Sequence, residues 1–201
     1  FAVARLTAGG KLDTTFDGDG KTTFDLSGAQ DTLRGVALQS NGKILVSGIA
    51  NVPVSSNRNM ALIRLNSNGS LDTTFGTGGL ATARFTAASP NFGDRPFGVA
   101  LQTDGKIVAA GYADSDDVAV ARWNTDGTLD TTFDGDGKVS TDFGTTDASA
   151  WSMTIQPDGK ILTGGRVNIN DSDVLLVRYN TDGSLDTTFS GDGISTANFG
   201  L

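Results

Sequence analysis

Pairs of aspartates in two short glycine-rich stretches are the residues best suited to chemistry in this sequence. Asp17 and Asp19 lie in one Asp-Gly-Asp-Gly stretch, and Asp134 and Asp136 lie in another. Ca²⁺ takes about 6–8 oxygen ligands, which closely spaced carboxylates and carbonyls can supply. The spacing is therefore compatible with calcium as a cofactor at these two places. The alternative is a glycine-rich turn with exposed aspartates, because the equivalent stretch at 76–79 (GTGG) has no acid.

A second set of aspartates belongs to a five-residue phrase, LDTTF, which occurs four times in the 201 residues. Asp-Thr-Thr suits a turn in which side-chain oxygens accept bonds from backbone N–H groups. An arginine on an apolar segment precedes each phrase, and a covered guanidinium requires a partner. Catalytic or metal sites are rarely built four times in one chain. We therefore expect structural pairs of Asp13, Asp72, Asp130 and Asp186 with Arg5, Arg64, Arg122 and Arg178.

The residue types that are missing exclude several classes of enzyme. The chain has no Cys and no His, which excludes thiol nucleophiles, Ser-His-Asp triads and imidazole metal sites. Two carboxylates flanking one bond could still hydrolyse a glycoside, but no aspartate pair departs from the repeat pattern. We therefore expect a protein that is not an enzyme and has no catalytic residues. An Asp-based glycan-active enzyme and a calcium-dependent adhesion module are the alternatives.

Composition predicts an all-β fold and argues against some partners. All 23 acidic residues are Asp, which favours turns, and there is no Glu, which favours helices. The net charge of −8 disfavours nucleic acid and anionic membrane surfaces as partners. No apolar run approaches the ~20 residues that a bilayer span requires.

Self-similarity at spacings of 59, 58 and 56 residues predicts four strands in each repeat. Strands A and B form a hairpin, as in GVALQ and KILVSG around Asn41-Gly42, a dipeptide that favours a two-residue type I′ turn. Strand C follows, as in VAVARWN, then the LDTTF loop and strand D, as in KVSTDF. Each repeat is therefore an antiparallel four-stranded unit.

Strand C is apolar on both faces, which is typical of a sheet covered on both sides. In the strand that starts at Val118, the valines point one way, and Ala119, Ala121 and Trp123 point the other. Repeated four-stranded sheets of this kind predict the blades of a β-propeller, whereas a β-sandwich would not need near-identical loops. The expected units are a half-blade with strands C and D at 1–33, and full blades at 34–95, 96–149 and 150–201.

Three recurrent motifs carry a family resemblance that covers nearly the whole chain. LDTTFDGDGK, GVALQTDGKIVAAG and VLLVRYNTDGSLDTTF resemble the bacterial delta-60 repeat, which is classed as a β-propeller repeat, and the A–B hairpins are also similar to NHL-type propeller blades. The resemblance implies a large, exported bacterial protein located outside the cell, on its surface or in the periplasm. It implies no enzyme activity, because the family has no established general function.

Loop variability predicts which end of the propeller binds partners. The A–B turns and C–D loops are nearly invariant among the repeats, whereas the B–C and D–A connections differ in length and composition. Loops carry function on a rigid frame, and aromatic and arginine side chains dominate binding hot spots. We expect a protein or glycan partner at Arg58, Phe92, Arg95, Tyr112 and Arg166. Unconstrained drift of these loops is the alternative.

Three and a half blades cannot close a ring, because propellers have typically about 4–8 blades. The half-blade would leave an unpaired strand edge, which invites pairing with another chain. Both ends of the chain resemble cut repeats rather than capping repeats. We therefore expect a piece of a longer repeat protein, or missing strands supplied by another chain. The 201 residues alone should self-associate or be poorly soluble.

Overall fold

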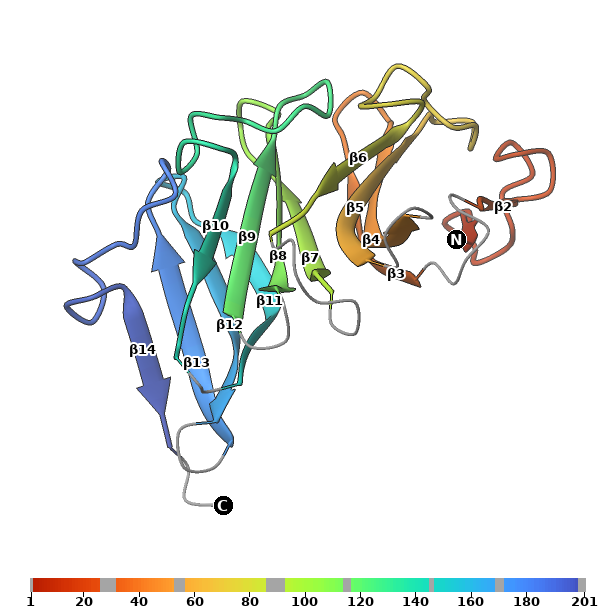
Figure 1. Cartoon of the computed structure of the whole chain (residues 1–201). Helices are drawn as coiled ribbons and strands as arrows, with labels where there is room; N and C mark the ends of the chain where they lie inside the picture. The colour runs from red at the N-terminus through yellow and green to blue at the C-terminus, as the bar shows by residue number, and fades with distance from the viewer. Residues whose placement is uncertain are drawn as a thin grey trace.

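The computed structural model is all-β, and it describes residues 2–25, 32–52, 57–85, 93–113, 117–144, 147–168 and 172–198. Within these ranges it has fourteen strands in four antiparallel sheets and no helix. Figure 1 shows the sheets side by side, with the two-stranded sheet at one end and the C-terminal sheet at the other. The described sheets do not close into a ring. This part of the chain also offers no helical segment of the length and apolarity that a membrane crossing needs.

Each expected unit forms a sheet of its own, with its strands in chain order. The half-blade contains β1 (Ala2–Ala4) and β2 (Lys21–Thr23). The first full blade contains β3 (Thr32–Leu38), β4 (Ile44–Val52), β5 (Asn57–Leu65) and β6 (Leu80–Ala83). The second contains β7 (Arg95–Leu101), β8 (Ile107–Ala113), β9 (Asp117–Trp123) and β10 (Lys138–Thr141). The third contains β11 (Ala148–Ile155), β12 (Ile161–Asn168), β13 (Ser172–Tyr179) and β14 (Ile194–Ala197). Each strand A begins one or two residues before the expected blade boundary.

Strand C is covered on both faces, as its sequence predicts, because alternate side chains pack against different neighbouring blades. On β9, Val118 and Val120 belong to a buried cluster with residues of the third full blade. Ala119 and Trp123 belong to a second cluster with residues of the first full blade. The hydrophobic core therefore consists of separate layers, and each layer lies between two neighbouring blades.

The A–B hairpin turns differ from the expected type I′ turn. Gly42 has a φ of 81°, but Asn41 is not among the residues with positive φ. Gly42 N–H donates to the carbonyl of Gln39, and Gln39 N–H donates to the carbonyl of Lys43. These bonds define a three-residue loop in which a type I turn is followed by a left-handed glycine. The Asn41 side chain keeps an ordinary φ and accepts the N–H of Lys43, which favours this turn.

Each strand A contains a β-bulge that the sequence pattern does not predict. The pairing register shifts between Leu33 and Gly35 in β3, between Pro96 and Gly98 in β7, and between Ala150 and Ser152 in β11. The extra residues are therefore Arg34, Phe97 and Trp151. A bulge re-aims a side chain and is often found beside a functional site.

A glycine of strand B lies opposite each bulge because the two backbones approach closely there. A Cβ on Gly165 would lie 1.8 Å from the carbonyl oxygen of Ser149, whereas a Cβ on the adjacent Gly164 would lie 3.4 Å from Leu176. The bulge therefore requires glycine at one position of this pair and not at the other.

We predict that Gly165→Ala destabilises the protein by roughly 3 kcal/mol, because the backbone of β11 must move to make room. Gly164→Ala is the matched control, and its unfolding free energy should lie within about 1 kcal/mol of wild type. Urea unfolding followed by far-UV circular dichroism measures both variants. Equal losses in the two variants would contradict the close approach at the bulge.

Candidate functional site

The four LDTTF loops share one geometry, in which the aspartate holds its own loop closed. Asp130 Oδ1 accepts the N–H of Thr132 at 3.1 Å and the Thr132 hydroxyl at 2.7 Å. The leucine of each phrase forms an isolated bridge back to the end of strand C, such as Leu129 with Trp123. The same threonine bonds are made by Asp13, Asp72 and Asp186.

The second carboxylate oxygen of each aspartate binds the arginine of the same repeat, as the sequence predicts. Arg122 Nε lies 2.7 Å from Asp130 Oδ2, and the guanidinium lies over the Phe133 ring, 4.7 Å from its centroid. Equivalent ion pairs join Arg5 to Asp13, Arg64 to Asp72 and Arg178 to Asp186. Asp and Phe of the phrase therefore hold one guanidinium by its edge and its face.

A lysine that sequence reasoning missed completes three of these pairs. It follows the A–B turn, and Lys106 Nζ lies 2.9 Å from Asp130 Oδ2. Lys43 and Lys160 bind Asp72 and Asp186 in the same way. The recurrent Gly-Lys after each hairpin turn was the available signal. Among the described residues no lysine binds Asp13 in this way, and its side chain is 24% exposed, against 4% for Asp130.

These partners lower the pKa values of the aspartates. Burial alone would raise the pKa of Asp72 and of Asp130, but bonds from the lysine, threonine and arginine outweigh it and hold both well below their usual range. For Asp186, bonds from Thr188 and Lys160 are the strongest influences, and they also lower the pKa strongly. These carboxylates stay ionised and paired, which suits structural ions and not general acids.

The arginine clip also joins consecutive blades. Arg122 Nη1 donates to the carbonyl of Thr181, which lies in the turn after strand C of the next blade. Arg5 and Arg64 reach Ser67 and Thr125 in the same way. The backbone adds a second bond at each seam, since Asp134 N–H donates to the carbonyl of Asp182 at 2.8 Å. We call this arrangement the seam clip.

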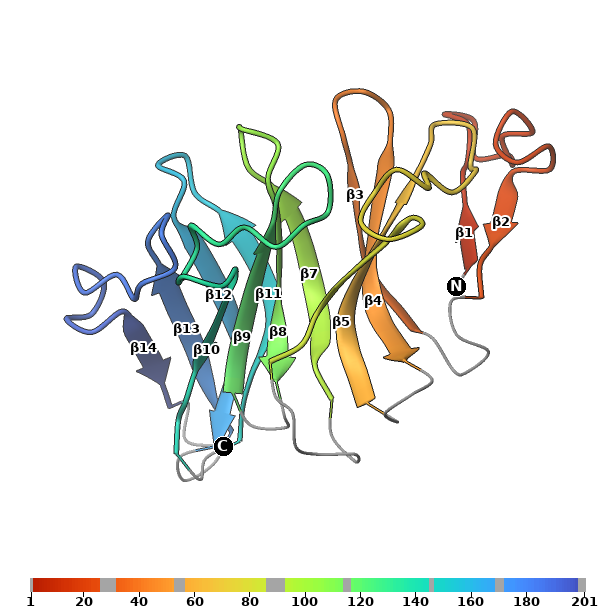
Figure 2. The same cartoon turned by 45° about the horizontal axis from the view of Figure 1, so that its top comes forward.

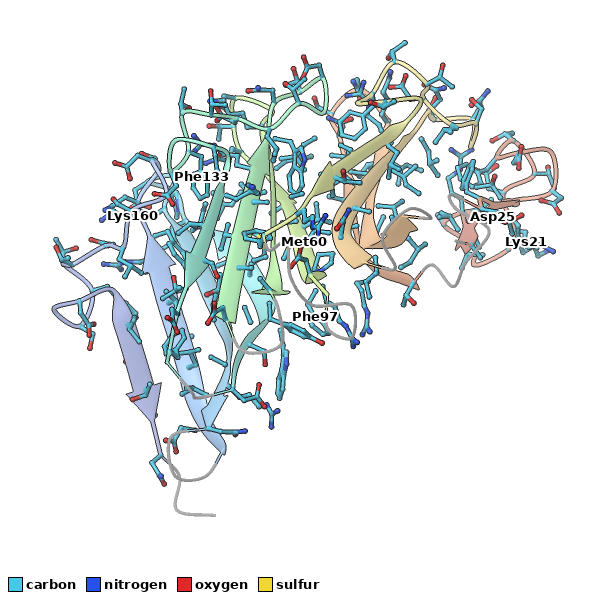
Figure 3. The ribbon with its side chains drawn as sticks, in the orientation of Figure 1. Lys21, Asp25, Met60, Phe97, Phe133 and Lys160 are labelled. Atoms are coloured by element: carbon cyan, nitrogen blue, oxygen red, sulfur yellow. The ribbon has the colours of Figure 1, made fainter. Side chains whose placement is uncertain are left out.

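A glycine in the same turn lets neighbouring blades approach each other. Gly183 has a φ of 97°, and a Cβ placed on it would lie 3.2 Å from the Phe133 ring. Phe16, Phe75 and Phe133 are each fully buried beneath such a turn. Figure 3 shows Phe133 and Lys160 toward the same end of the sheets. The nearly invariant face of the chain is therefore built of seam clips.

The residues proposed for calcium have other roles in this geometry. Asp17 and Asp134 have φ values of 51° and 50°, which Asp, Asn and Gly tolerate best, and Gly76 has the same conformation. Asp19 and Asp136 each accept the N–H of the lysine two residues later. Among the described residues, no group of three or more acidic side chains is placed to share a metal ion. Each loop therefore offers at most two carboxylates toward the roughly 6–8 oxygens that calcium takes.

The pKa of Asp134, unlike those of the LDTTF aspartates, is shifted upward. Burial is the main cause, and the charges of Asp136 and Asp182 add to it. This repulsion arises where two seam loops meet, because Asp182 belongs to the turn that accepts the Asp134 N–H. It makes the LDTTF loop of the second full blade locally negative.

A different set of side chains gathers at the opposite ends of the sheets, toward the variable connections. The Arg34 guanidinium lies over the Phe97 ring at 4.9 Å, and the Phe97 and Tyr112 rings are 5.8 Å apart. Arg95 lies over Tyr112 at 5.6 Å. In the next blade Arg166 lies over Trp151 at 5.7 Å. These residues form what we call the arginine–aromatic row: Arg34, Arg95, Phe97, Tyr112, Trp151 and Arg166.

The row follows from the bulges in strand A. Arg34, Phe97 and Trp151 are the three extra residues, so the bulges aim equivalent side chains from three consecutive blades. Trp151 is 53% exposed. Figure 3 shows Phe97 toward the end of the sheets opposite to Phe133, and Figure 2 shows β3, β7 and β11 in successive sheets.

Two arginines of the row have unused hydrogen-bonding capacity. Arg166 Nη2 pairs with Asp147 Oδ2 at 2.6 Å, but its Nε is buried without a partner. The buried Nε of Arg95 also lacks a partner, and in the described ranges neither Arg34 nor Arg95 is paired with a carboxylate. The row therefore offers flat apolar faces beside guanidinium groups that can still donate.

Of the five residues expected on the variable face, Arg95 contacts Tyr112, and Arg166 contacts Trp151 in the next blade. Phe92 and the Arg58 side chain lie outside the described part. Sequence reasoning missed Arg34, Phe97 and Trp151. The signal was present, because a large residue that differs among the repeats comes directly before the recurrent segments GVALQ, GVALQ and SMTIQ.

The four-stranded sheets, stacked face to face and joined by seam clips, define the chain as a β-propeller protein. The chain belongs to the family described as "Domain of unknown function (DUF5122) beta-propeller", which matches residues 39–75, 102–133 and 156–189. These segments contain the hairpin turns, strand C and the LDTTF loops, and together they make up just over half of the chain.

Comparisons beyond the family add little. No curated protein matches the chain. A crystal structure of a protein of unknown function from Bacteroides caccae is similar at 11% identity and a TM-score of 0.47 over 86% of this chain. The chain spans about half of that protein, since 48% of it is covered.

We predict that Asp130→Asn destabilises the protein by about 3 kcal/mol, because it leaves Arg122 and Lys106 without a buried counter-charge. Asp13→Asn is the matched control, since the same loop there is partly exposed and lacks the lysine, and it should cost about 1 kcal/mol or less. Urea unfolding measures both. Equal effects would show that burial of the pair has no influence on stability.

Acid should weaken the same ion pairs. The folded pKa values of Asp72, Asp130 and Asp186 are lowered, so their stabilisation is fully present above the unfolded value of about 4 and is lost as the pH falls further. The melting temperature should therefore drop below about pH 4, with a shallower drop in Asp130→Asn. Parallel pH profiles for the two proteins would contradict this assignment.

We further predict that calcium at millimolar concentration produces no saturable heat in isothermal titration calorimetry, since the Asp19 and Asp136 carboxylates already bind the lysine two residues later. A saturable signal that is lost in an Asp134→Asn/Asp136→Asn variant would show that the third loop binds the ion. The second loop has glycines at 76 and 78 in place of both acids, so we expect it to contribute nothing to any calcium signal.

Proposed function

We propose that the chain is a non-enzymatic binding module that holds a carboxylate-bearing partner, protein or glycan, on the arginine–aromatic row. The observation that carries this proposal is the convergence of three arginines and three aromatic rings from three consecutive blades. Arginine recognises carboxylates through parallel N–H donors, and aromatic side chains supply rigid apolar contact area.

The charge distribution favours an anionic ligand that binds at a local cluster of arginines on an otherwise acidic protein. The net charge is −8, so a partner that binds through charge must be attracted by a local cluster and not by the whole surface. The row provides such a cluster, because the Arg34 side chain is exposed and neither Arg34 nor Arg95 is paired with a carboxylate in the described ranges.

A non-enzymatic role is supported by the state of the aspartates. The LDTTF carboxylates bond to threonine, arginine and, in the full blades, lysine within their own repeats, and they lie on the seam-clip face, away from the row. An Asp-based glycosidase would require two free carboxylates flanking one bond. The resemblance to the delta-60 repeat supports an exported bacterial protein that works outside the cell, on its surface or in the periplasm.

Tryptophan fluorescence offers a direct test, because Trp151 is 53% exposed whereas Trp123 is fully buried. We expect oligogalacturonate or a poly-aspartate peptide to change the emission saturably, and the neutral oligogalactan or poly-asparagine counterpart to have no effect. A response to one acidic probe alone identifies a glycan or a protein as the partner class. No response to either acidic probe would contradict the proposal.

Variants assign the response to the row. Trp151→Phe should abolish the fluorescence change, and Arg95→Gln should weaken binding about tenfold when calorimetry replaces fluorescence, which corresponds to about 1.4 kcal/mol. Asp136→Asn is the control on the opposite face and should bind as wild type does. Equal losses in Arg95→Gln and Asp136→Asn would place binding elsewhere.

A further inference from the structure

We propose that a cleft between the second and third full blades binds a neutral saccharide. The cleft has a volume of about 640 Å³, which lies within the range of about 300–1,000 Å³ that small-molecule sites occupy. Both of its walls belong to full blades, so it is part of an internal seam. It lies on the seam-clip face, and the proposal is therefore independent of the partner proposed for the arginine–aromatic row.

The walls of the cleft are the A–B turns of the two blades. The turn at 101–106 forms one wall, and the turn at 155–159 forms the other. Arg122 and Thr181, which bond to each other in the seam clip, complete the lining. Figure 2 shows the turn between β7 and β8 and the turn between β11 and β12 at the same end of neighbouring sheets. Backbone bonds close both turns, so the walls are held in place without a ligand.

A lysine supplies hydrogen-bond donors to the cleft. Lys106 Nζ lies 2.9 Å from Asp130 Oδ2, and the lysine side chain is 28% exposed. An ammonium group has three N–H donors, and Asp130 is the one partner that Nζ has in the described ranges. Two donors of Lys106 are therefore available to a ligand.

Two exposed aspartates supply acceptors at the rim of the cleft. Asp104 Oδ1 accepts the N–H of Lys106 at 3.0 Å, and Asp158 Oδ1 accepts the N–H of Lys160 at 3.1 Å. These bonds fix the orientation of both carboxylates. In the described part of the chain the second oxygen of each carboxylate has no protein partner, so it can accept a hydrogen bond from a ligand.

The lining favours a neutral ligand that is rich in hydroxyl groups. An anion would face the two rim carboxylates, and a cation would face Lys106 and Arg122, and like-charge contacts lower affinity. A hydroxyl group is neutral and both donates and accepts, so it can bond to a carboxylate and to the ammonium group at once. A sugar ring also has C–H surface, which fits the partly buried side chains of Leu101 and Ile155.

The chain itself shows that a rim aspartate can be replaced without disturbing its turn. Asn41 occupies the place of Asp158 in the first full blade, and it accepts the N–H of Lys43 in the same way. Asp158→Asn should therefore fold normally, but it turns the free oxygen into an NH₂ group that cannot accept. Asp126→Asn is the matched control, because Asn68 has the equivalent place in the first full blade and Asp126 does not line the cleft.

A bulky side chain at the rim tests the position of the site. Thr103 is an exposed residue of the lining, so Thr103→Trp should fill the mouth of the cleft. Ser40→Trp is its control, since Ser40 is the exposed residue at the same place in the A–B turn of the first full blade and does not line this cleft.

Saturation-transfer difference NMR on the full chain measures binding of maltose, cellobiose and lactose. We expect at least one of them to bind saturably, with a Kd of about 1 mM. Asp158→Asn should raise this Kd about fivefold and Thr103→Trp at least about tenfold, while Asp126→Asn and Ser40→Trp bind as wild type does. All four variants should melt within a few degrees of wild type. Oligogalacturonate should not compete, because the row lies at the opposite ends of the sheets.

Three results would overturn the proposal, and none of them depends on the fluorescence test of the row. The first is that none of the three disaccharides binds at about 20 mM. The second is equal weakening by Asp158→Asn and Asp126→Asn, or by Thr103→Trp and Ser40→Trp, which would place the saccharide elsewhere. The third is binding of putrescine or inorganic phosphate that Thr103→Trp abolishes and that is tighter than binding of any disaccharide, which would show that the cleft selects an ion.

Discussion

A buried guanidinium is the group on which the packing of the blades depends. Taking an arginine out of water is costly unless its charge and its donors all find partners. Arg122 meets this requirement with atoms from two blades: Asp130 and Phe133 of its own repeat, and the Thr181 carbonyl of the next. One arginine bonds to atoms of both blades. A blade therefore cannot tilt or slide on its neighbour without leaving the guanidinium charge unpaired. The seam is thereby fixed in register as well as in distance.

The difference in sequence variation between the two faces follows from this requirement. At the seam-clip face, changing any residue of the LDTTF loop would disturb two blades at once, which explains why the phrase is constant. At the other end, the bulged residue of strand A contacts no equivalent clip, so Arg34, Phe97 and Trp151 can differ. Variation there changes the chemistry of the row without changing the frame that carries it.

The sequence predicts those features that depend on contacts within one repeat. Strand order, the two covered faces of the strand at Val118 and the pairing of Asp130 with Arg122 all follow from local patterns and recurrent spacing. The bulge at Phe97 does not, because a bulge is a property of the register between two strands and leaves the alternation of side chains only slightly altered. The carbonyl partners of the arginines were also missed, since nothing in one repeat shows which turn of the next lies beside it. The left-handed backbone at Asp17 and Asp134 was not predicted either, because a left-handed backbone and a metal site select similar residues.

The geometry of the seam clip has a consequence for how such chains change over evolutionary time. Each clip lies between consecutive repeats, with donors on one side and acceptors on the other, so duplicating a whole repeat creates one new seam that is already complete. No compensating substitution is needed, because the inserted unit presents to both neighbours the groups that they already bind. Blade number can therefore change by recombination within a gene while every interface stays intact. Selection is then free to act on the residues of the row in each new copy.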